Sequence, residues 1–288
     1  MKKILAATDV SEQRSSAVVT GVACAGRLGA ELEIVHVVEV LLLPAAYAPP
    51  GLEPAEYEPT ILSEARNKAE AEAKQAGAEG ASIHIRSGFA APAIVRVAEE
   101  TQADMLVVGA YPQPAITRTL VGSTAERVLR IAHIPVLVAS EARTEPFRRV
   151  LAAVDLSRQS RKVLETASAV AQADRAELRV LYVLEPLPMM LAEAAVYDEA
   201  EHRRHAREHL ESVLEGAGLL GEPSVEARMH EGEAGHRILD EAQDWAADLI
   251  VMGSHGFGFF DRLLMGSTSL YVLRHGHCAT LIVPPEKE

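Results

Sequence analysis

The segment 253–268, GSHGFGFFDRLLMGST, carries the residues whose types and spacing indicate chemistry. Gly253 and Gly256 stand three residues apart, and nine residues later an expected helix opens with Gly266, Ser267 and Thr268. Glycines let main-chain N–H groups approach a bound anion, and a helix start adds free N–H donors and a positive dipole end. The pattern therefore predicts a phosphate site, although glycines alone are equally consistent with an ordinary turn and helix cap.

Two other nucleotide-binding patterns are missing. The sequence has no G-x-x-x-x-G-K-[ST] phosphate loop, and no G-x-G-x-x-G follows the first expected strand. At that second place stand Asp9 and, later in the chain, Asp155, each closing an expected strand. The sequence is therefore not that of a P-loop ATPase or of a Rossmann dehydrogenase.

The chain is a tandem duplication that positions these residues twice. Blocks recur in one order, 4–11 as 150–157, 31–39 as 177–185, 103–110 as 247–254 and 122–130 as 266–274. Such matches indicate two copies of one domain, expected at 1–143 and 147–288. Each copy alternates short β-branched runs with helical patterns, which predicts five parallel strands and four helices on both faces of a sheet.

Three segments between these blocks have weaker patterns. We expect helices over 61–76 and 198–215, where alanine and charged residues dominate. The proline-rich stretch 44–59 is expected to be an excursion over the surface, and 186–199 to be partly helical.

Composition narrows the function classes. The 288 residues carry a net charge of −13, which disfavours nucleic acid and anionic membranes as partners. The two cysteines provide neither a disulfide framework nor a metal-cluster spacing. No apolar run reaches membrane-spanning length, and the N-terminal run is too short for a signal peptide. We therefore expect a cytoplasmic protein with no nucleic-acid and no membrane partner.

The pattern G-x-x-G, nine residues, G-[ST] resembles the ATP-binding signature of the universal stress protein family. Both copies are similar to the family elsewhere, in the aspartate that closes the first strand, in D-[ML]-[LI]-V-[VM]-G and in the apolar last strand. The resemblance implies two open, twisted, five-stranded parallel sheets of order 3-2-1-4-5, the adenine nucleotide α-hydrolase-like fold. In that order strands 1 and 4 meet at the switch point where open α/β sheets bind ligands.

The resemblance also implies an ATP site in the second copy, with or without Mg²⁺. Asp155 and the backbone of Val183 would contact the adenosine end. The phosphates would be held by Gly253, Gly256, Gly266, Ser267 and Thr268, and Met252 and Ser254 are further cofactor-binding residues of this site. Arg262, inside the loop, is interpreted as a solvated surface charge, with a phosphate contact as the alternative.

The first copy keeps most of this pattern. Its corresponding residues are Asp9, Val37, Gly109, Gly122, Ser123 and Thr124. Pro112 replaces the second glycine, so the loop loses an N–H donor and conformational freedom. We expect the second copy to be the better ATP site and the first to be weaker or empty. The alternative is that Pro112 lies outside the anion path and that both sites fill.

The function that the resemblance implies is a nucleotide-dependent regulator of a stress response. We predict no catalytic residue and at most slow ATP hydrolysis. A scaffold without a ligand and an ATP-hydrolysing or adenylating enzyme are the alternatives. The enzyme is disfavoured because the S-G-G-x-[DS]-S loop of adenylating relatives is missing after the first strand.

Two further features concern metals and assembly. His202, His205 and His209 share one expected helix face, which we interpret as a solvated charged face rather than a metal site. The last strands, 136–138 and 281–283, would leave bare edges. Their pairing would make an intramolecular pseudo-dimer, with a homodimer and protein partners left open.

Overall fold

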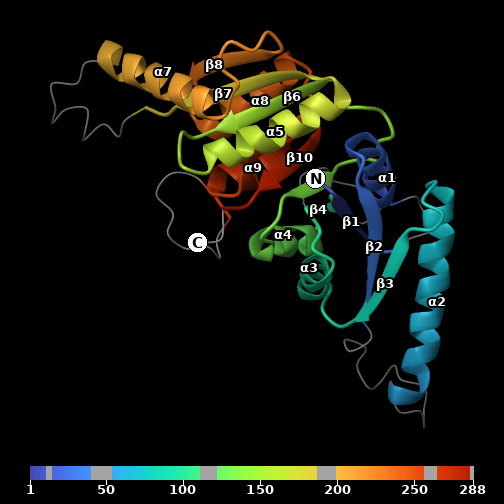
Figure 1. Cartoon of the computed structure of the whole chain (residues 1–288). Helices are drawn as coiled ribbons and strands as arrows, with labels where there is room; N and C mark the ends of the chain where they lie inside the picture. The colour runs from blue at the N-terminus through green and yellow to red at the C-terminus, as the bar shows by residue number, and fades with distance from the viewer. Residues whose placement is uncertain (11–14, 40–53, 111–121, 187–198, 256–264, 286–288) are drawn as a thin grey trace. The chain divides into compact units, whose positions relative to one another are not determined.

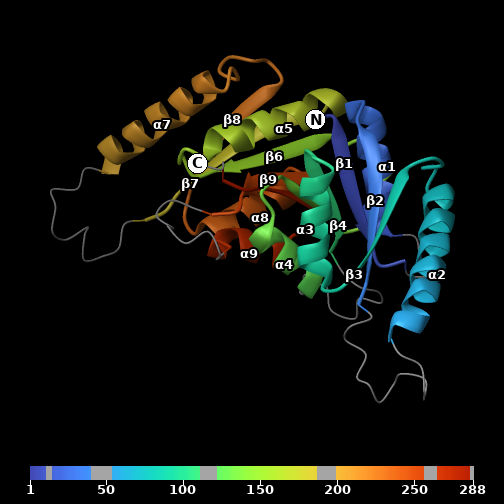
Figure 2. The same cartoon turned by 60° about the horizontal axis from the view of Figure 1, so that its bottom comes forward.

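The computed structural model describes residues 1–10, 15–39, 54–110, 122–186, 199–255 and 265–285. These residues form two compact units, Met1–Pro146 and Phe147–Glu288 (Figures 1 and 2). No described helix combines the length and the apolar character that a membrane crossing requires.

The first unit is a parallel sheet covered by helices on both faces. Its strands are β1 (Lys3–Thr8), β2 (Glu31–Val38), β3 (Ser82–Ser87), β4 (Met105–Gly109) and β5 (Val136–Ala139), in the order β3-β2-β1-β4-β5. Its described helices are α1 (Ser16–Leu28), α2 (Pro54–Gln75), α3 (Ala90–Glu100) and α4 (Ser123–Ile131). In Figure 1, α1 and α2 cover one face of the sheet, and α3 and α4 pack together on the other.

The second unit repeats this architecture. Its strands are β6 (Arg149–Val154), β7 (Glu177–Leu184), β8 (Val225–Glu231), β9 (Leu249–Gly253) and β10 (Ala279–Val283), in the order β8-β7-β6-β9-β10. Its described helices are α5 (Ser160–Asp174), α7 (Glu199–Gly216), α8 (Ala234–Asp244) and α9 (Ser267–His275). The α/β class predicted from the sequence, with a parallel sheet and helices on both faces, is confirmed.

The central strands are continuously apolar because both of their faces are covered. Ile4, Leu5 and Ala6 of β1 are fully buried, as are their counterparts in β6, Val150, Leu151 and Ala152. Helix α1 begins after Ser15, whose side chain accepts a hydrogen bond from the Val18 N–H, and ends at Gly29 with φ +63°. Because the strands are parallel, their carboxyl ends lie at one edge of each sheet, and the helices that follow them begin near that edge.

The predicted surface excursion over 44–59 is wrong from residue 54 onward. Helix α2 already begins at Pro54, because the first turn of a helix needs no N–H donor and the fixed φ of proline suits it. Pro59 follows in the second turn without ending the helix. Residues 44–53 and most of 186–199 lie outside the described residues. Helix α7 runs one residue later at each end than predicted.

The second strand of each unit carries a charged side chain of low exposure at the same repeat position, with opposite charge. In β2, Glu33 is 5% exposed and accepts hydrogen bonds from Lys3 Nζ and His84 Nε2, both at 2.7 Å. In β7 the corresponding residue is Arg179, which pairs with Glu226 and Glu241. Each unit therefore has a charge network that joins its second strand to neighbouring elements, and the partners differ between the units.

Acidification is expected to weaken the first unit through Glu33. Burial raises the pKa of its carboxyl, but the hydrogen bonds and charges of Lys3 and His84 outweigh burial and hold the pKa below its ordinary value. A carboxyl with a lowered folded-state pKa stabilises the fold above its unfolded pKa, and this contribution is lost as pH falls through the folded-state pKa. Glu33→Gln should cost about 1–3 kcal/mol at pH 7.

Urea unfolding of the full chain from pH 7 to pH 3 tests this expectation. The stability difference between the wild type and Glu33→Gln should shrink below about pH 4.5, the ordinary range of a glutamate. Glu31→Gln is the matched control, because this exposed neighbour lies 3.9 Å from Lys3 Nζ and should change stability little. A difference that stays constant with pH would contradict the assignment.

Candidate functional site

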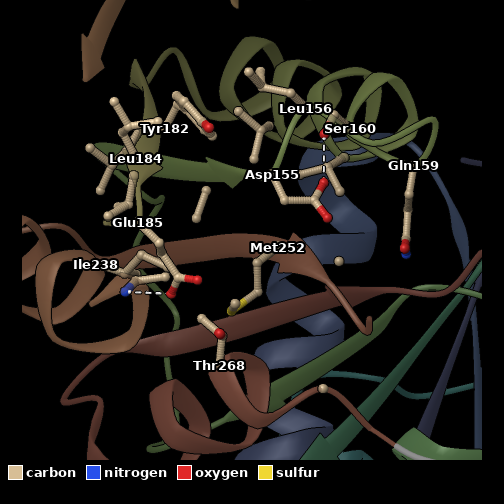
Figure 3. A pocket seen from close by; sticks show the side chains of 18 of the residues that line it. Asp155, Leu156, Gln159, Ser160, Tyr182, Leu184, Glu185, Ile238, Met252 and Thr268 are labelled. Atoms are coloured by element: carbon tan, nitrogen blue, oxygen red, sulfur yellow. Dashed lines mark hydrogen bonds between the residues drawn. The ribbon is translucent and has the colours of Figure 1, made fainter. Parts of the chain in front are cut away.

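The second unit has a cleft at the carboxyl edge of its sheet. Its volume is about 610 Å³, within the range of small-molecule sites. The cleft lies where β6 and β9 are neighbours, which is the switch point of the strand order (Figure 3). Its lining includes the described residues predicted for this site except Ser254, namely Asp155, Val183, Met252, Gly253, Gly266, Ser267 and Thr268.

Asp155 is the most informative of these residues. Its Oδ1 accepts hydrogen bonds from the Ser157 N–H and the Ser160 hydroxyl, both at 3.0 Å, and Figure 3 shows the bond to Ser160. Its Oδ2 is buried and has no hydrogen-bond partner among the residues that the structure describes. A buried acceptor without a donor is costly, so this oxygen marks a place for a donor group of a ligand.

The opposite end of the cleft is built from backbone. Gly266 has φ −59° and ψ 145° and caps α9 without a side-chain hydrogen bond, which leaves N–H groups of the first turn to a ligand. The Gly266 N–H donates to the Ser254 carbonyl, and the Ser269 hydroxyl donates to the Gly253 carbonyl, both at 2.8 Å. These bonds hold the end of β9 against the start of α9, and a helix start of this kind is able to bind an anion.

Two predicted residues have other surroundings. Ser254 is 2% exposed and is absent from the cleft lining, and its hydroxyl lies 2.8 Å from His255 Nδ1. His255 lines the cleft instead. Gly256 and Arg262, and with them the middle of the loop, lie outside the described residues.

The sequence did not predict the wall that α7 contributes. His202, His205 and His209 line the cleft beside Ala206, so the face interpreted as solvated also borders the site. Their spacing of three and four residues indicates that they share one helix face, but it does not indicate that this face borders the cleft. Among the residues that are described, no group of three or more His, Cys, Asp or Glu side chains is arranged to hold a metal ion.

The ends of β7 and α8 complete the cleft with Tyr182, Glu185, Ala234 and Ile238. Burial raises the pKa of the Tyr182 hydroxyl, and the charges of Asp155 and Glu185 raise it further. Glu185 accepts a hydrogen bond from the Ala234 N–H at 3.2 Å, at the start of α8. This bond places the Glu185 carboxylate at the positive end of the α8 dipole.

The first unit places its predicted residues in the corresponding order. Asp9 follows β1, Val37 lies in β2, and Gly109 ends β4. Gly122 caps α4 with φ −58° and ψ 142°, and Ser123 and Thr124 follow in the first turn. The Gly122 N–H donates to the Ala110 carbonyl at 2.7 Å, as Gly266 does to Ser254. Pro112 lies outside the described residues, so its predicted effect stays a prediction.

An open parallel α/β sheet with a cleft at its switch point is typical of the doubly wound ligand-binding folds, among which is the adenine nucleotide α-hydrolase-like fold. The model of the universal stress protein family matches the chain twice, over residues 1–140 and 146–284. The chain belongs to the universal stress protein family and consists of two such domains in tandem.

Individual relatives agree with this assignment. A universal stress protein of Thermus aquaticus is 37% identical over 138 residues, covering 48% of this chain and 98% of its own length. One from Synechocystis is 32% identical over 151 residues, covering 48% and 97%. One from Mycobacterium tuberculosis is 27% identical over 213 residues, covering 70% and 72%.

A solved structure reproduces the tandem fold. The crystal structure of a universal stress protein from Archaeoglobus fulgidus aligns with a TM-score of 0.71 at 21% identity, covering 98% of each chain. At this identity the similarity shows the fold alone.

Proposed function

We propose that the second unit binds ATP in its cleft and that the bound nucleotide regulates the protein in a stress response. The observation that carries the proposal is the buried Asp155 Oδ2, an acceptor without a donor at the switch point of the sheet. Membership of the universal stress protein family supports the same ligand class.

The two ends of the cleft suit the two ends of ATP. The triphosphate would lie at the start of α9, where Gly266, Ser267 and Thr268 offer N–H and hydroxyl donors. Adenosine would lie toward Asp155 and Val183, where a ribose hydroxyl or the adenine amino group would donate to Oδ2. A bound Mg²⁺ would add positive charge between the phosphates, and the hydroxyls of Ser267 and Thr268 are oxygen ligands of the kind that it takes.

A binding role accounts for these groups better than rapid turnover. Backbone N–H groups and hydroxyls at a helix start stabilise the negative charge of a phosphate, but they are not bases that could activate a water molecule. The regulator would therefore respond to whether ATP is bound, with hydrolysis slow or absent. Mass spectrometry of small molecules released from freshly purified, denatured protein should find about one ATP per chain.

Substitution of Asp155 tests the site. Asp155→Ala should weaken ATP binding by about tenfold to a hundredfold, the value of a hydrogen bond to a charged group. Isothermal titration with Mg-ATP measures the change. Titrations with 2′-deoxy-ATP, which lacks the ribose 2′-hydroxyl, and with inosine triphosphate, which lacks the adenine amino group, show which group donates to Oδ2. The analogue that lacks the donating group should bind the wild type more weakly than ATP does, but should bind Asp155→Ala as well as ATP does.

The duplication supplies the matched control. Asp9→Ala removes the carboxylate at the same position of the first unit and should leave the ATP affinity of the second unit unchanged. Equal ATP affinity in the wild type and in a folded Asp155→Ala would exclude this position for the adenosine end.

A further inference from the structure

The first unit has a part-buried carboxylate at the edge where the second unit has its cleft. Glu72 extends from α2, and its Oε2 accepts a hydrogen bond from the Thr8 hydroxyl at 2.6 Å. Its Oε1 accepts the Ser15 N–H at 2.9 Å. Thr8 ends β1 and Ser15 caps α1, so one side chain of α2 connects the strand end with the following helix start.

The duplication shows what this place becomes in the second unit. Thr8 donates a hydrogen bond to the Glu72 carboxylate, and Asp9 and His36 are titratable neighbours of that carboxylate. The repeat spacing pairs these three residues with Val154, Asp155 and Tyr182, all of which line the cleft. The Glu72 carboxylate therefore lies beside the first-unit counterparts of three residues that line the cleft in the second unit.

Helix α7 has no carboxylate at the position of Glu72. Both helices end in the same turn, with the Ala78 N–H bonded to the Ala73 carbonyl at 2.8 Å and the Leu219 N–H to the Leu214 carbonyl at 2.9 Å. This common turn aligns the buried faces of the helices and pairs Glu72 with Val213. The carboxylate is thus particular to the first unit.

The environment of Glu72 opposes a further negative charge. Burial raises the pKa of its carboxyl and the bonds from Thr8 and Ser15 lower it. The nearby Asp9 raises this pKa and the nearby His36 lowers it, and the net result is an increase. An anionic ligand in the first unit would meet both Asp9 and Glu72. Like charges placed together in such a site weaken binding strongly.

We propose that Glu72 excludes anionic nucleotides from the first unit by occupying its ligand position. Its two oxygens take the Thr8 hydroxyl and the Ser15 N–H as donors, and its charge repels phosphate. The inference rests on the proposed function, because the excluded ligand is the nucleotide of the second unit. It differs from the prediction based on Pro112, since here α2 rather than the loop closes the first unit.

Replacement of Glu72 by its counterpart should open the first unit. Titration of the full chain with Mg-ATP should give one equivalent for the wild type. Glu72→Val should add a second equivalent, with the first-unit affinity raised by about tenfold or more. Glu72→Gln, which keeps the shape and removes the charge, should act in the same direction. Glu70→Gln, an exposed glutamate of the same helix, is the control and should change nothing.

The same titrations on a chain that also carries Gly266→Asp, which is designed to disable the site of the second unit, show which unit binds each equivalent of ATP. In that background ATP binding should appear only when Glu72 is replaced. If both Glu72 variants melt cooperatively and still bind one equivalent, or if the wild type binds two, the inference is overturned. If Gly266→Asp leaves the equivalent of the wild type intact, the proposed placement of the phosphates at the start of α9 fails, separately from the inference about Glu72. A wild type and a Glu72→Val that both bind no ATP overturn the two together.

Discussion

Replacing Gly266 with aspartate is expected to lower the ATP affinity of the second unit by at least about a hundredfold while the protein stays folded. Gly266 caps α9 with φ −59° and ψ 145°, a backbone conformation that suits an aspartate cap. The new carboxylate would accept hydrogen bonds from the N–H groups of the first turn, and those donors would be lost to the ligand. It would also place a negative charge where the phosphates are proposed to lie.

Titration with Mg-ATP and thermal melting together measure the two parts of this expectation. Gly122→Asp is the matched control, because Gly122 caps α4 with φ −58° and ψ 142°. Both substitutions should leave the melting temperature unchanged or slightly higher, since aspartate favours a helix start. Only Gly266→Asp should abolish ATP binding.

A neutral substitution separates charge from volume at Gly266. Gly266→Asn fills the same space and also caps a helix, but it adds no charge, so it should weaken ATP binding less than Gly266→Asp. If folded Gly266→Asp retains wild-type affinity, the phosphates do not lie at the start of α9, and the orientation proposed for ATP is wrong.

The fold was predictable because its signals are local and occur twice. Apolar runs such as Ile4–Leu5–Ala6 identify buried strands, and the repeat at 150–152 confirms the pattern within one sequence. The start of α2 was missed because proline usually interrupts helices, whereas Pro54 occupies the first turn, where it is favoured.

The candidate site was predictable only where its residues sit next to strand ends. Asp155 and the glycines follow their strands directly, so the strand order brings them together. The bond between Glu72 and Thr8 joins residues 64 positions apart, and it depends on the rotation of α2 against the sheet. The same holds for the histidines of α7, since the spacing gives a face but not what that face contacts.

The charge networks were unpredictable for a related reason. Repeat positions 33 and 179 carry opposite charges, so the duplication gives no common rule for their partners. Arg179 takes Glu226 from the neighbouring strand and Glu241 from α8, which no sequence spacing connects. Such a network must be judged from burial and geometry.

Removing Arg179 is expected to destabilise the second unit by about 3 kcal/mol, because breaking a buried ion pair leaves an uncompensated charge. The Arg179 side chain is 13% exposed, and its Nη1 lies 2.6 Å from Oε1 of Glu241, whose side chain is 9% exposed. The guanidinium also lies over the Trp245 ring at 4.2 Å. In Arg179→Met, Glu241 would lose the guanidinium and keep its contact with His230 Nε2, at 3.2 Å.

Urea unfolding followed by fluorescence measures this loss, because Trp245 is the sole tryptophan and reports on the second unit. Arg228→Met is the matched control: Arg228 also pairs with Glu226, but its side chain is 51% exposed, so the cost should stay below about 1 kcal/mol. Equal losses for the two arginines would contradict a special role of burial.

The double variant Arg179→Met with Glu241→Gln decides whether the cost arises from the stranded carboxylate. If it does, neutralising Glu241 should recover more than half of the stability lost in Arg179→Met, although Glu241→Gln alone should be destabilising. If the two losses simply add, the stability instead comes from the packing of Arg179 on Trp245, which is lost both in Arg179→Met and in the double variant. The sign of the coupling therefore separates charge compensation from packing at a repeat position where the two units of the chain carry opposite charges.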